Sequence, residues 1–184
     1  YLRNNASRVT EADYLVARTM QAAIDWLQRS HSHGPFYLHV DSFDPHEPWD
    51  PPQHYVDLYK DPEFDGEEVI YPAHMPPDYL TAAELEHVRA LYAAEVTMVD
   101  HWLGQLLTEI DDLGLADRTV VIFMSDHGFL HGEHNAIGKT WTGGGHFEAY
   151  PLFQELVHIP LMIRYPGQAH RLNKEALVQP ADIM

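Results

Sequence analysis

The 184-residue sequence predicts an α/β domain in which a mainly parallel sheet is flanked by helices. Three short runs, at residues 36–42, 119–125 and 160–164, have the β-branched, aliphatic and aromatic content of buried strands. They alternate with helical patterns at 10–30 and 81–113. Strands that are separated by helices usually pair in parallel, and this order therefore favours the α/β class.

The first predicted element is a helix over residues 10–30. Thr10 and Asp13 have the spacing of an N-terminal cap. Apolar residues that would face the core follow at helical intervals: Leu15, Met20, Ala23, Ile24 and Leu27. Gly34 and Pro35 interrupt this pattern, so we expect the strand at 36–42 to begin directly after them.

Residues 43–79 are predicted to form an ordered loop rather than a linker. Prolines recur through this segment and exclude a long helix or a central strand. Aromatic residues are interleaved with them, namely Trp49, Tyr55, Tyr59, Phe64 and Tyr71. A disordered linker is depleted in such residues, and a loop of this length inside a compact domain is usually functional.

The second half begins with a long helix, for which Thr81 and Glu84 form a capping box. An apolar stripe continues to about Leu113, and Gly114 is typical of the position after a helix. The predicted strand 119–125, a loop, a short helix near 150–157 and the strand 160–164 follow. Residues 176–184 resemble a strand that enters a new helix, so we expect the domain to be incomplete at both ends of the chain.

The loop at residues 125–140 is the strongest candidate for a functional site. In open α/β sheets, ligands bind where strands end, and this loop follows a strand-type run. Asp126 and His127 are adjacent metal-type donors, and Lys139 brings an ammonium group to the same loop. Together they predict a metal ion beside an oxyanion.

An alternative for this loop is an ordinary turn in which the Asp126 carboxylate accepts a local hydrogen bond. The metal-capable side chains that follow, His131, Glu133 and His134, favour the functional interpretation because turn chemistry does not require them.

Composition excludes several classes of function. The chain has 28 acidic and 11 basic residues and a formal net charge of −17, which disfavours nucleic acid as a partner. No apolar run approaches the length of a membrane span, so no membrane association is expected. Cysteine is absent, which removes disulfides, thiolate metal sites and a cysteine nucleophile, and leaves the compartment undetermined.

Four sequence blocks then show a resemblance to a known family. They are PFYLHVDSFDPHEPWDPP from Pro35, DDLGLADRTVVIFMSDHG at the end of the long helix, GEHNAIGKT from Gly132, and HIPLMIRYPG from His158. In order and spacing they resemble arylsulfatase-like members of the sulfatase family, in the alkaline phosphatase superfamily. The resemblance implies that residues 1–184 are part of one alkaline-phosphatase-like catalytic domain.

The resemblance also implies roles for individual residues. Asp126 and His127 would be part of the ligand set of one divalent metal, with Ca²⁺ favoured. Sulfatases often have Asn at the place of His127, whereas phosphonate monoester hydrolases have His with Mn²⁺ or Zn²⁺, so those metals stay open. Lys139 would stabilise the transferring group, and His46 would contact the sulfate or donate a proton to the leaving oxygen.

Other polar residues of these blocks are expected to act indirectly. Asp41 and Asp44 would orient His46 from behind. Glu133, His134 and Asn135 would shape the loop through hydrogen bonds. The remaining histidines singled out are expected to be structural or to line the rim of the site: His39, His101, His146 and His158.

Sulfatases act through a C/S-x-P-x-R segment whose Cys or Ser becomes formylglycine, and no residue of this chain matches that pattern. We therefore expect hydrolysis of a small-molecule sulfate ester by a longer protein, with this chain inactive by itself. A phosphonate or phosphodiester hydrolase of the same superfamily, or a non-catalytic binding module with the same fold, are the alternatives.

Overall fold

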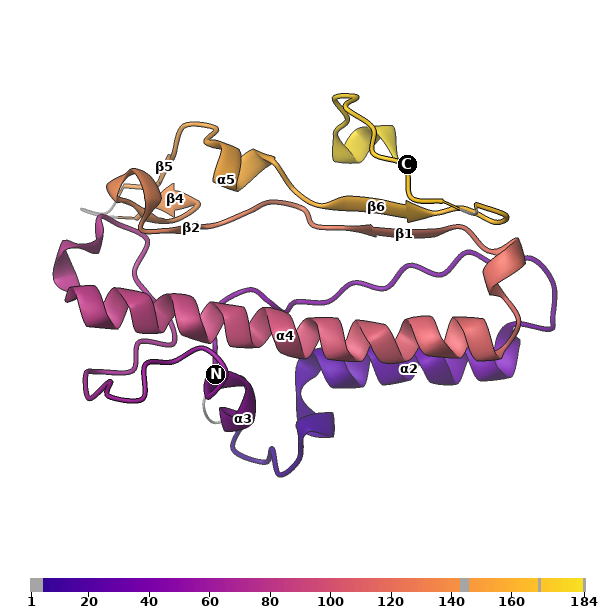
Figure 1. The fold of residues 1–184 in the computed structure, drawn as a ribbon, viewed down its shortest axis with the longest axis horizontal. Coiled ribbons are helices and arrows are strands. Elements are labelled where there is room, and N and C mark those ends of the chain that lie inside the picture. The colour runs from indigo at the N-terminus through magenta and orange to yellow at the C-terminus, as the bar shows by residue number, and fades with distance from the viewer. Residues whose placement is uncertain (1–4, 143–145, 169, 184) are drawn as a thin grey trace.

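The computed structural model describes residues 5–142, 146–168 and 170–183, and it arranges them in two layers (Figure 1). Helices α2 (Leu15–Ser30) and α4 (Ala82–Asp112) lie side by side in one layer. The strands β1 (Val121–Met124) and β6 (Leu161–Arg164) lie in the other. This arrangement of helices against strands confirms the predicted α/β class.

Helix α2 begins later than the sequence pattern suggests. Thr10 and Asp13 do form a capping box, but it encloses only the short 3-10 helix η1 (Glu11–Asp13). Tyr14 is extended and separates η1 from α2. Four of the five predicted stripe residues face inward, because Met20, Ala23, Ile24 and Leu27 are buried. Leu15, at the first turn of α2, is 42% exposed and does not face the core as expected.

Helix α4 follows its sequence signals closely. The Thr81 hydroxyl accepts a hydrogen bond from the Glu84 amide, and the Glu84 carboxylate accepts one from the Thr81 amide at 2.7 Å. The expected capping box is thus formed. Gly114 ends the helix with a φ of +65°, a left-handed conformation that glycine adopts without steric cost.

The principal hydrophobic core lies between α2, α4 and the loop 43–79. Trp49 is fully buried, and Tyr55 and Val56 of the short helix α3 (Gln53–Val56) are also buried. The 3-10 helix η2 (Pro77–Tyr79) leads this loop into α4. Trp49 and Tyr55 of the loop therefore contribute to the core, whereas Tyr59 and Tyr71 face solvent.

The strand pairings within the described ranges are antiparallel, which corrects the expected mainly parallel sheet. β1 pairs with β6, β2 (Leu130–His131) with β3 (Ile137–Gly138), and β4 (Thr140–Trp141) with β5 (Glu148–Ala149). The chain between β1 and β6 consists of short hairpins and the helix α5 (Gln154–Val157), and it returns β6 along β1 in the opposite direction.

Residues 36–42 do not form the expected strand, because no described residue pairs with their backbone. Their side chains nevertheless alternate between exposed and partly buried positions. Phe36, Leu38 and Val40 pack against the core, while Tyr37 is 88% exposed. The sequence pattern therefore identified which side faces inward, but a strand also requires a neighbour for its hydrogen bonds.

Two further elements are shorter than expected. Of the predicted helix at 150–157, only α5 is helical. In the described part of 176–184 there is no strand, and the 3-10 helix η6 (Pro180–Asp182) stands alone. The 3-10 helices η3 (Ala116–Arg118) and η4 (Glu133–Asn135) complete the described elements.

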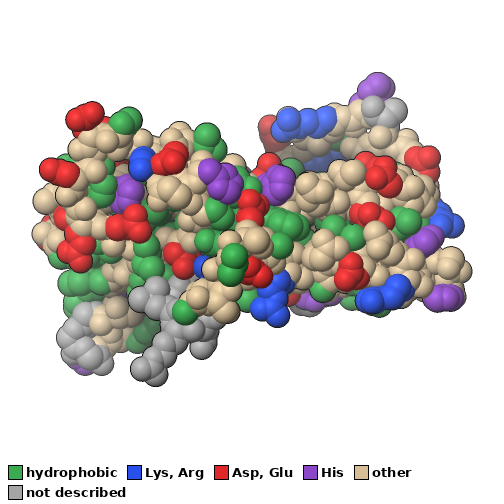
Figure 2. All heavy atoms as spheres, turned by 90° about the horizontal axis from the view of Figure 1, so that it is seen from below, with side chains coloured by type: hydrophobic (Ala, Val, Ile, Leu, Met, Phe, Trp, Pro, Cys, Tyr) green, Lys and Arg blue, Asp and Glu red, His purple; other side chains and the backbone are tan. Residues whose placement is uncertain are grey.

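The charged side chains on the surface agree with the acidic composition of the chain. Figure 2 shows the helical face, on which acidic side chains are widely scattered and basic side chains are fewer. On the other layer, the β1–β6 pair exposes apolar side chains, including Ile122 at 44% and Met162 at 58%. Within the described ranges, no helix combines the length and the apolarity that crossing a bilayer requires.

Candidate active site

The candidate site lies where three loops meet. Asp126 and His127 follow the end of β1, and Lys139 lies between β3 and β4. His46 comes from the loop 43–79, where the Asp44–Pro45 and Glu47–Pro48 peptide bonds on either side of it are cis. The His46 amide donates a hydrogen bond to the Phe43 carbonyl at 3.0 Å, which holds this turn in place.

Lys139 lies between the two histidines. Its Nζ is 3.0 Å from Nε2 of His46 and 2.9 Å from Nε2 of His127. The two imidazole rings face each other edge to face, with their centroids 6.5 Å apart. The structure thus brings together Lys139, His46 and His127, three of the four residues that the sequence analysis assigned to one site.

Hydrogen bonding determines which ring nitrogens carry protons. Nδ1 of His127 is 2.9 Å from the Gly128 carbonyl, and Nδ1 of His46 is 2.8 Å from the Glu47 carbonyl. A carbonyl oxygen only accepts, so each Nδ1 donates and each Nε2 of a neutral ring has a lone pair for the Lys139 ammonium. An ammonium has three N–H groups, and two of them are used in these contacts.

Glu47, which was not among the predicted site residues, lies next to the His46 ring. Its side chain is 1% exposed, and its Oε2 lies 3.1 Å from Nδ1 of His46. Its Oε1 accepts a hydrogen bond from Nε2 of His74 at 2.8 Å. Burial raises a carboxyl pKa, but the hydrogen bonds from His74 and the backbone, together with nearby His46, hold the pKa of Glu47 below its usual value.

The two residues expected to orient His46 do not do so. Asp41 is exposed, and Asp44 accepts a hydrogen bond from the Val16 amide at 2.9 Å, at the start of α2. Asp44 therefore stabilises the N-terminus of a helix, and burial raises its pKa. Glu47 occupies the position expected for these two because the tight turn at His46 brings the carboxylate of the next residue to the ring.

The loop 125–140 is attached to α5 by close contacts. The Gly128 amide donates to the Leu156 carbonyl at 2.9 Å, and a Cβ at Gly128 would lie 1.8 Å from the Glu155 carbonyl oxygen. His134 stacks on Phe153 at 3.7 Å and contacts the Glu155 carboxylate at 3.1 Å. These contacts fix the segment that carries Asp126 and His127.

Other members of the loop have structural surroundings. The Glu133 carboxylate accepts a hydrogen bond from the His131 amide at 2.6 Å, and Asn135 is left-handed with a φ of +55°. The His131 ring lies among Trp49, Tyr92 and Phe129, at centroid distances of 5.3, 4.2 and 5.0 Å. Burial in this aromatic cluster lowers the pKa of His131 to about 4, so the ring is neutral and belongs to the core.

The remaining histidines of interest lie at the surface. His39, His101, His146 and His158 are exposed, and none of the hydrogen bonds described for the site involves them.

Asp126 and His127 provide two donors that fit one cation. Oδ2 of Asp126 is 3.5 Å from Nε2 of His127, close to the separation of about 3.2 Å expected for adjacent ligands at metal distances near 2.3 Å. The Asp126 side chain is 84% exposed, and its Oδ1 also accepts from the His127 amide at 2.9 Å, as the turn alternative requires. No group of three or more metal-type side chains occurs in the part of the chain that the structure describes, and a metal at this pair would need further ligands.

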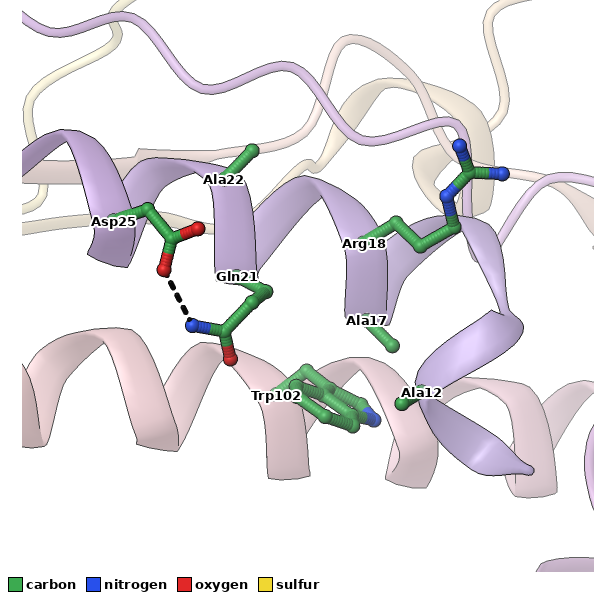
Figure 3. Close-up of a pocket in the computed structure, with 7 residues that line it drawn as sticks. All are labelled: Ala12, Ala17, Arg18, Gln21, Ala22, Asp25 and Trp102. Atoms are coloured by element: carbon green, nitrogen blue, oxygen red, sulfur yellow. Dashed lines mark hydrogen bonds between the residues drawn. The ribbon is translucent and has the colours of Figure 1, made fainter.

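A separate hollow of about 250 Å³ lies on the helical side of the molecule (Figure 3). Its walls include Ala17, Gln21 and Asp25 of α2 and Trp102 of α4. Gln21 donates to Asp25 at 2.8 Å, and the Trp102 indole donates to Glu11 at 2.8 Å. The polar groups of Gln21, Asp25 and Trp102 thus have partners within the protein, and none of the candidate site residues lines the hollow.

Comparison with known proteins identifies the family. The sequence profile of the family described as "Sulfatase" matches residues 2–184. The chain belongs to the sulfatase family. It is 30% identical to the arylsulfatase of Clostridium perfringens over 129 residues, which cover 64% of this chain and 27% of that protein. It is 29% identical to iduronate 2-sulfatase of Homo sapiens, over 84% of this chain and 31% of that protein.

A solved structure shows the same fold. The phosphonate monoester hydrolase of Agrobacterium radiobacter superimposes with a TM-score of 0.68 at 24% identity, over 86% of this chain and 34% of that one. This chain spans about a third of the length of each of these three proteins. The family identity and the alkaline-phosphatase-like fold expected from the sequence are confirmed.

Proposed function

We propose that this chain forms part of a hydrolase that cleaves small-molecule sulfate esters. The observation that carries the proposal is the position of the Lys139 ammonium, within 3.0 Å of both His46 and His127. Two histidines from separate loops lie at this one ammonium group, next to the exposed carboxylate of Asp126. Family membership and the identities to sulfatases support the same activity.

In this proposal, Lys139 binds the sulfuryl group. The ammonium uses two N–H groups on the histidines, so the third is available for a non-bridging oxygen of the ester. Negative charge grows on the oxygens around the cleaved bond in the transition state, and a preorganised ammonium stabilises that charge. The neighbouring imidazoles hold Nζ in place, which reduces the reorganisation that binding requires.

His46 is proposed to assist the leaving group or to contact the sulfate. In the tautomer described above, Nε2 accepts a hydrogen bond, so the ring must take up a proton on Nε2 before it can donate one to the leaving oxygen. The His46 side chain is 31% exposed and can exchange protons with solvent. Because Nε2 of His46 is 3.0 Å from Nζ of Lys139, it would lie near the ester oxygens that the ammonium binds.

Asp126 and His127 are proposed to bind one divalent metal ion. Sulfatases as a family use such an ion, which when bound would polarise the ester oxygens and neutralise their charge. A hard carboxylate suits Ca²⁺, our first choice, whereas the imidazole suits Mn²⁺ or Zn²⁺. With a metal on Nε2 of His127, the Lys139 ammonium would lose its contact with that nitrogen, because one lone pair cannot serve both, and only His46 would then hold Nζ in place.

The nucleophile is proposed to lie outside these 184 residues. The chain has no cysteine, and none of its serines has the C/S-x-P-x-R surroundings of a formylglycine precursor. We therefore expect the separate chain to cleave no ester, and the residues to act within a longer protein that supplies a nucleophile and further metal carboxylates.

The test compares two substrates on the whole protein. We expect faster turnover of 4-nitrophenyl sulfate than of 4-nitrophenyl phenylphosphonate, and a C/S-x-P-x-R segment in the gene upstream of residue 1. Faster turnover of the phosphonate would instead favour the second candidate, a phosphonate monoester hydrolase, which His127 at the metal position supports. Absence of both activities and of the upstream segment would favour a binding module and overturn the proposal.

A further inference from the structure

A buried carboxylate and a second histidine connect the two loops that carry His46 and Lys139. Glu47 is next to His46 in sequence and its carboxylate faces Nδ1 of that ring, and His74 comes from the far end of the loop 43–79. Neither residue was among the predicted site residues. Their contacts join one side of the candidate site to the other, and this inference rests on the proposed function of that site.

The contact between His74 and Gly138, the residue before Lys139, is unusually close. A Cβ at Gly138 would lie 2.6 Å from Cγ of His74, so the imidazole packs directly on the Gly138 backbone. The His74 carbonyl accepts a hydrogen bond from the Thr142 amide at 3.0 Å, and Met75 accepts one from Ile137. Residues 74–75 are therefore hydrogen-bonded to the chain both before and after Lys139.

From His74 the connection continues through Glu47. Nε2 of His74 donates to Oε1 at 2.8 Å, and both side chains are largely buried, at 13% and 1% exposed. The other oxygen, Oε2, is buried and lacks a hydrogen-bond partner, although Nδ1 of His46 is 3.1 Å away. An unpaired buried carboxylate oxygen costs free energy. The position of Nδ1 of His46, the polar group that Oε2 faces, therefore matters for the stability of this carboxylate.

Nδ1 of His46 therefore lies between two oxygens of one residue. The Glu47 carbonyl is 2.8 Å away and Oε2 is 3.1 Å away, and neither oxygen can donate. A lone pair on Nδ1 would be repelled by both. The proton is thus confined to Nδ1, and Nε2 is directed at Lys139.

We propose that Glu47 is a positioning residue, which fixes the tautomer and orientation of His46 and, through His74, its distance from Lys139. A carboxylate is required because it presents an acceptor oxygen to each imidazole, Oε1 to His74 and Oε2 to His46. An amide in its place must turn an N–H₂ group toward one ring, and that ring then has to change its tautomer or move.

The decisive variant is E47Q, with E95Q as the matched control. Glu95 is also buried, at 2% exposed, and lies on α4 with no described contact to His46. Side-chain ¹⁵N spectra of the histidines report the tautomer directly, without any need for catalysis. We expect Nδ1-protonated His46 in the unmodified protein and in E95Q, and a tautomeric mixture in E47Q.

Kinetics of the whole protein give the second measurement. We expect E47Q to lower kcat by about 10- to 100-fold with little change in KM, as for other residues that orient a reacting group. H74N should act in the same direction, and it tests the link independently if E47Q folds poorly. An unaltered His46 tautomer in both E47Q and H74N would overturn the inference, as would equal losses of kcat in E47Q and E95Q.

The two proposals fail in different ways. A protein that cleaves neither ester but whose His46 tautomer depends on Glu47 contradicts the proposed function and supports the positioning role. An active protein whose His46 tautomer and kcat are unaffected by E47Q and H74N supports the function and contradicts the positioning role.

Discussion

Nζ of Lys139 and Nε2 of His46 are 3.0 Å apart although 93 residues separate them in the sequence. The ammonium reaches His46 because the segment β3–β4, which contains Lys139, lies against the loop 43–79. His74 of that loop packs on Gly138 of β3. An ammonium held in this way between two imidazoles has a defined position before any substrate arrives.

Replacing Lys139 tests its proposed role in charge stabilisation. K139M should lower kcat/KM for 4-nitrophenyl sulfate by about 10²- to 10³-fold, which is typical for loss of one donor to an oxyanion. The matched control is K60M, because Lys60 pairs only with Asp57 in the described contacts, at 2.8 Å. Steady-state rates of K139M that equal those of K60M would rule out the role.

Asp126 and Lys139 should have opposite effects on metal binding. D126N removes a charged oxygen ligand, and we expect it to weaken Mn²⁺ or Ca²⁺ binding by at least about tenfold. K139M removes a competing cation from Nε2 of His127, and we expect it to strengthen binding. Isothermal titration calorimetry measures both, with the exposed Asp117 changed to Asn as the control. If D126N binds as tightly as D117N, Asp126 is not a ligand.

Glu95 should make stability depend on pH. Burial raises its pKa to about 9, with the Asp44 and Asp50 carboxylates adding to the shift. The folded state thus holds a proton that the unfolded chain releases near pH 4.5, and this stabilisation is lost as the pH rises toward 9.

E95Q removes this dependence because the amide does not ionise. We expect urea denaturation to show E95Q and the unmodified protein equally stable at pH 4, and E95Q more stable by on the order of 2–4 kcal/mol at pH 9. E175Q, which replaces an exposed glutamate, should have the same stability as the unmodified protein at each pH. A pH-independent gap between E95Q and the unmodified protein would contradict the raised pKa.

Two glycines should respond in opposite directions to the same substitution. G128A places a methyl group 1.8 Å from the Glu155 carbonyl oxygen, and we expect a loss of about 2–4 kcal/mol of stability. Gly104 lies within α4, and a Cβ added there would have no atom within 4 Å, so G104A should gain about 0.5–1 kcal/mol. Thermal unfolding distinguishes them, and a G128A protein as stable as G104A would show that the loop is not held against α5.

Local signals in the sequence identified some elements well. The Thr81–Glu84 box and Gly114 mark the ends of α4 because capping depends on residues within one turn. The alternation at 36–42 identified the inward side chains, but strand pairing depends on a partner that local sequence does not specify. The antiparallel return of β6 along β1 depends on the path of the whole intervening chain.

In the candidate site, too, some residues could be identified from the sequence and others depend on the folded chain. Asp126, His127, Lys139 and His46 stand out because of their residue types and the family resemblance, and their roles stay predictions. Glu47 did not stand out, since a glutamate between His46 and a proline resembles a surface residue. Its burial depends on His74, 27 residues away, and on a turn that only the folded chain defines.

The open β1–β6 pair has a practical consequence for work with this polypeptide. Ile122 and Met162 present hydrocarbon to water on a two-stranded ribbon whose outer backbone groups can pair with a neighbouring molecule. Solutions of the separate 184-residue polypeptide should therefore become turbid as they are concentrated or warmed, and a mild detergent should clear them better than a change of salt.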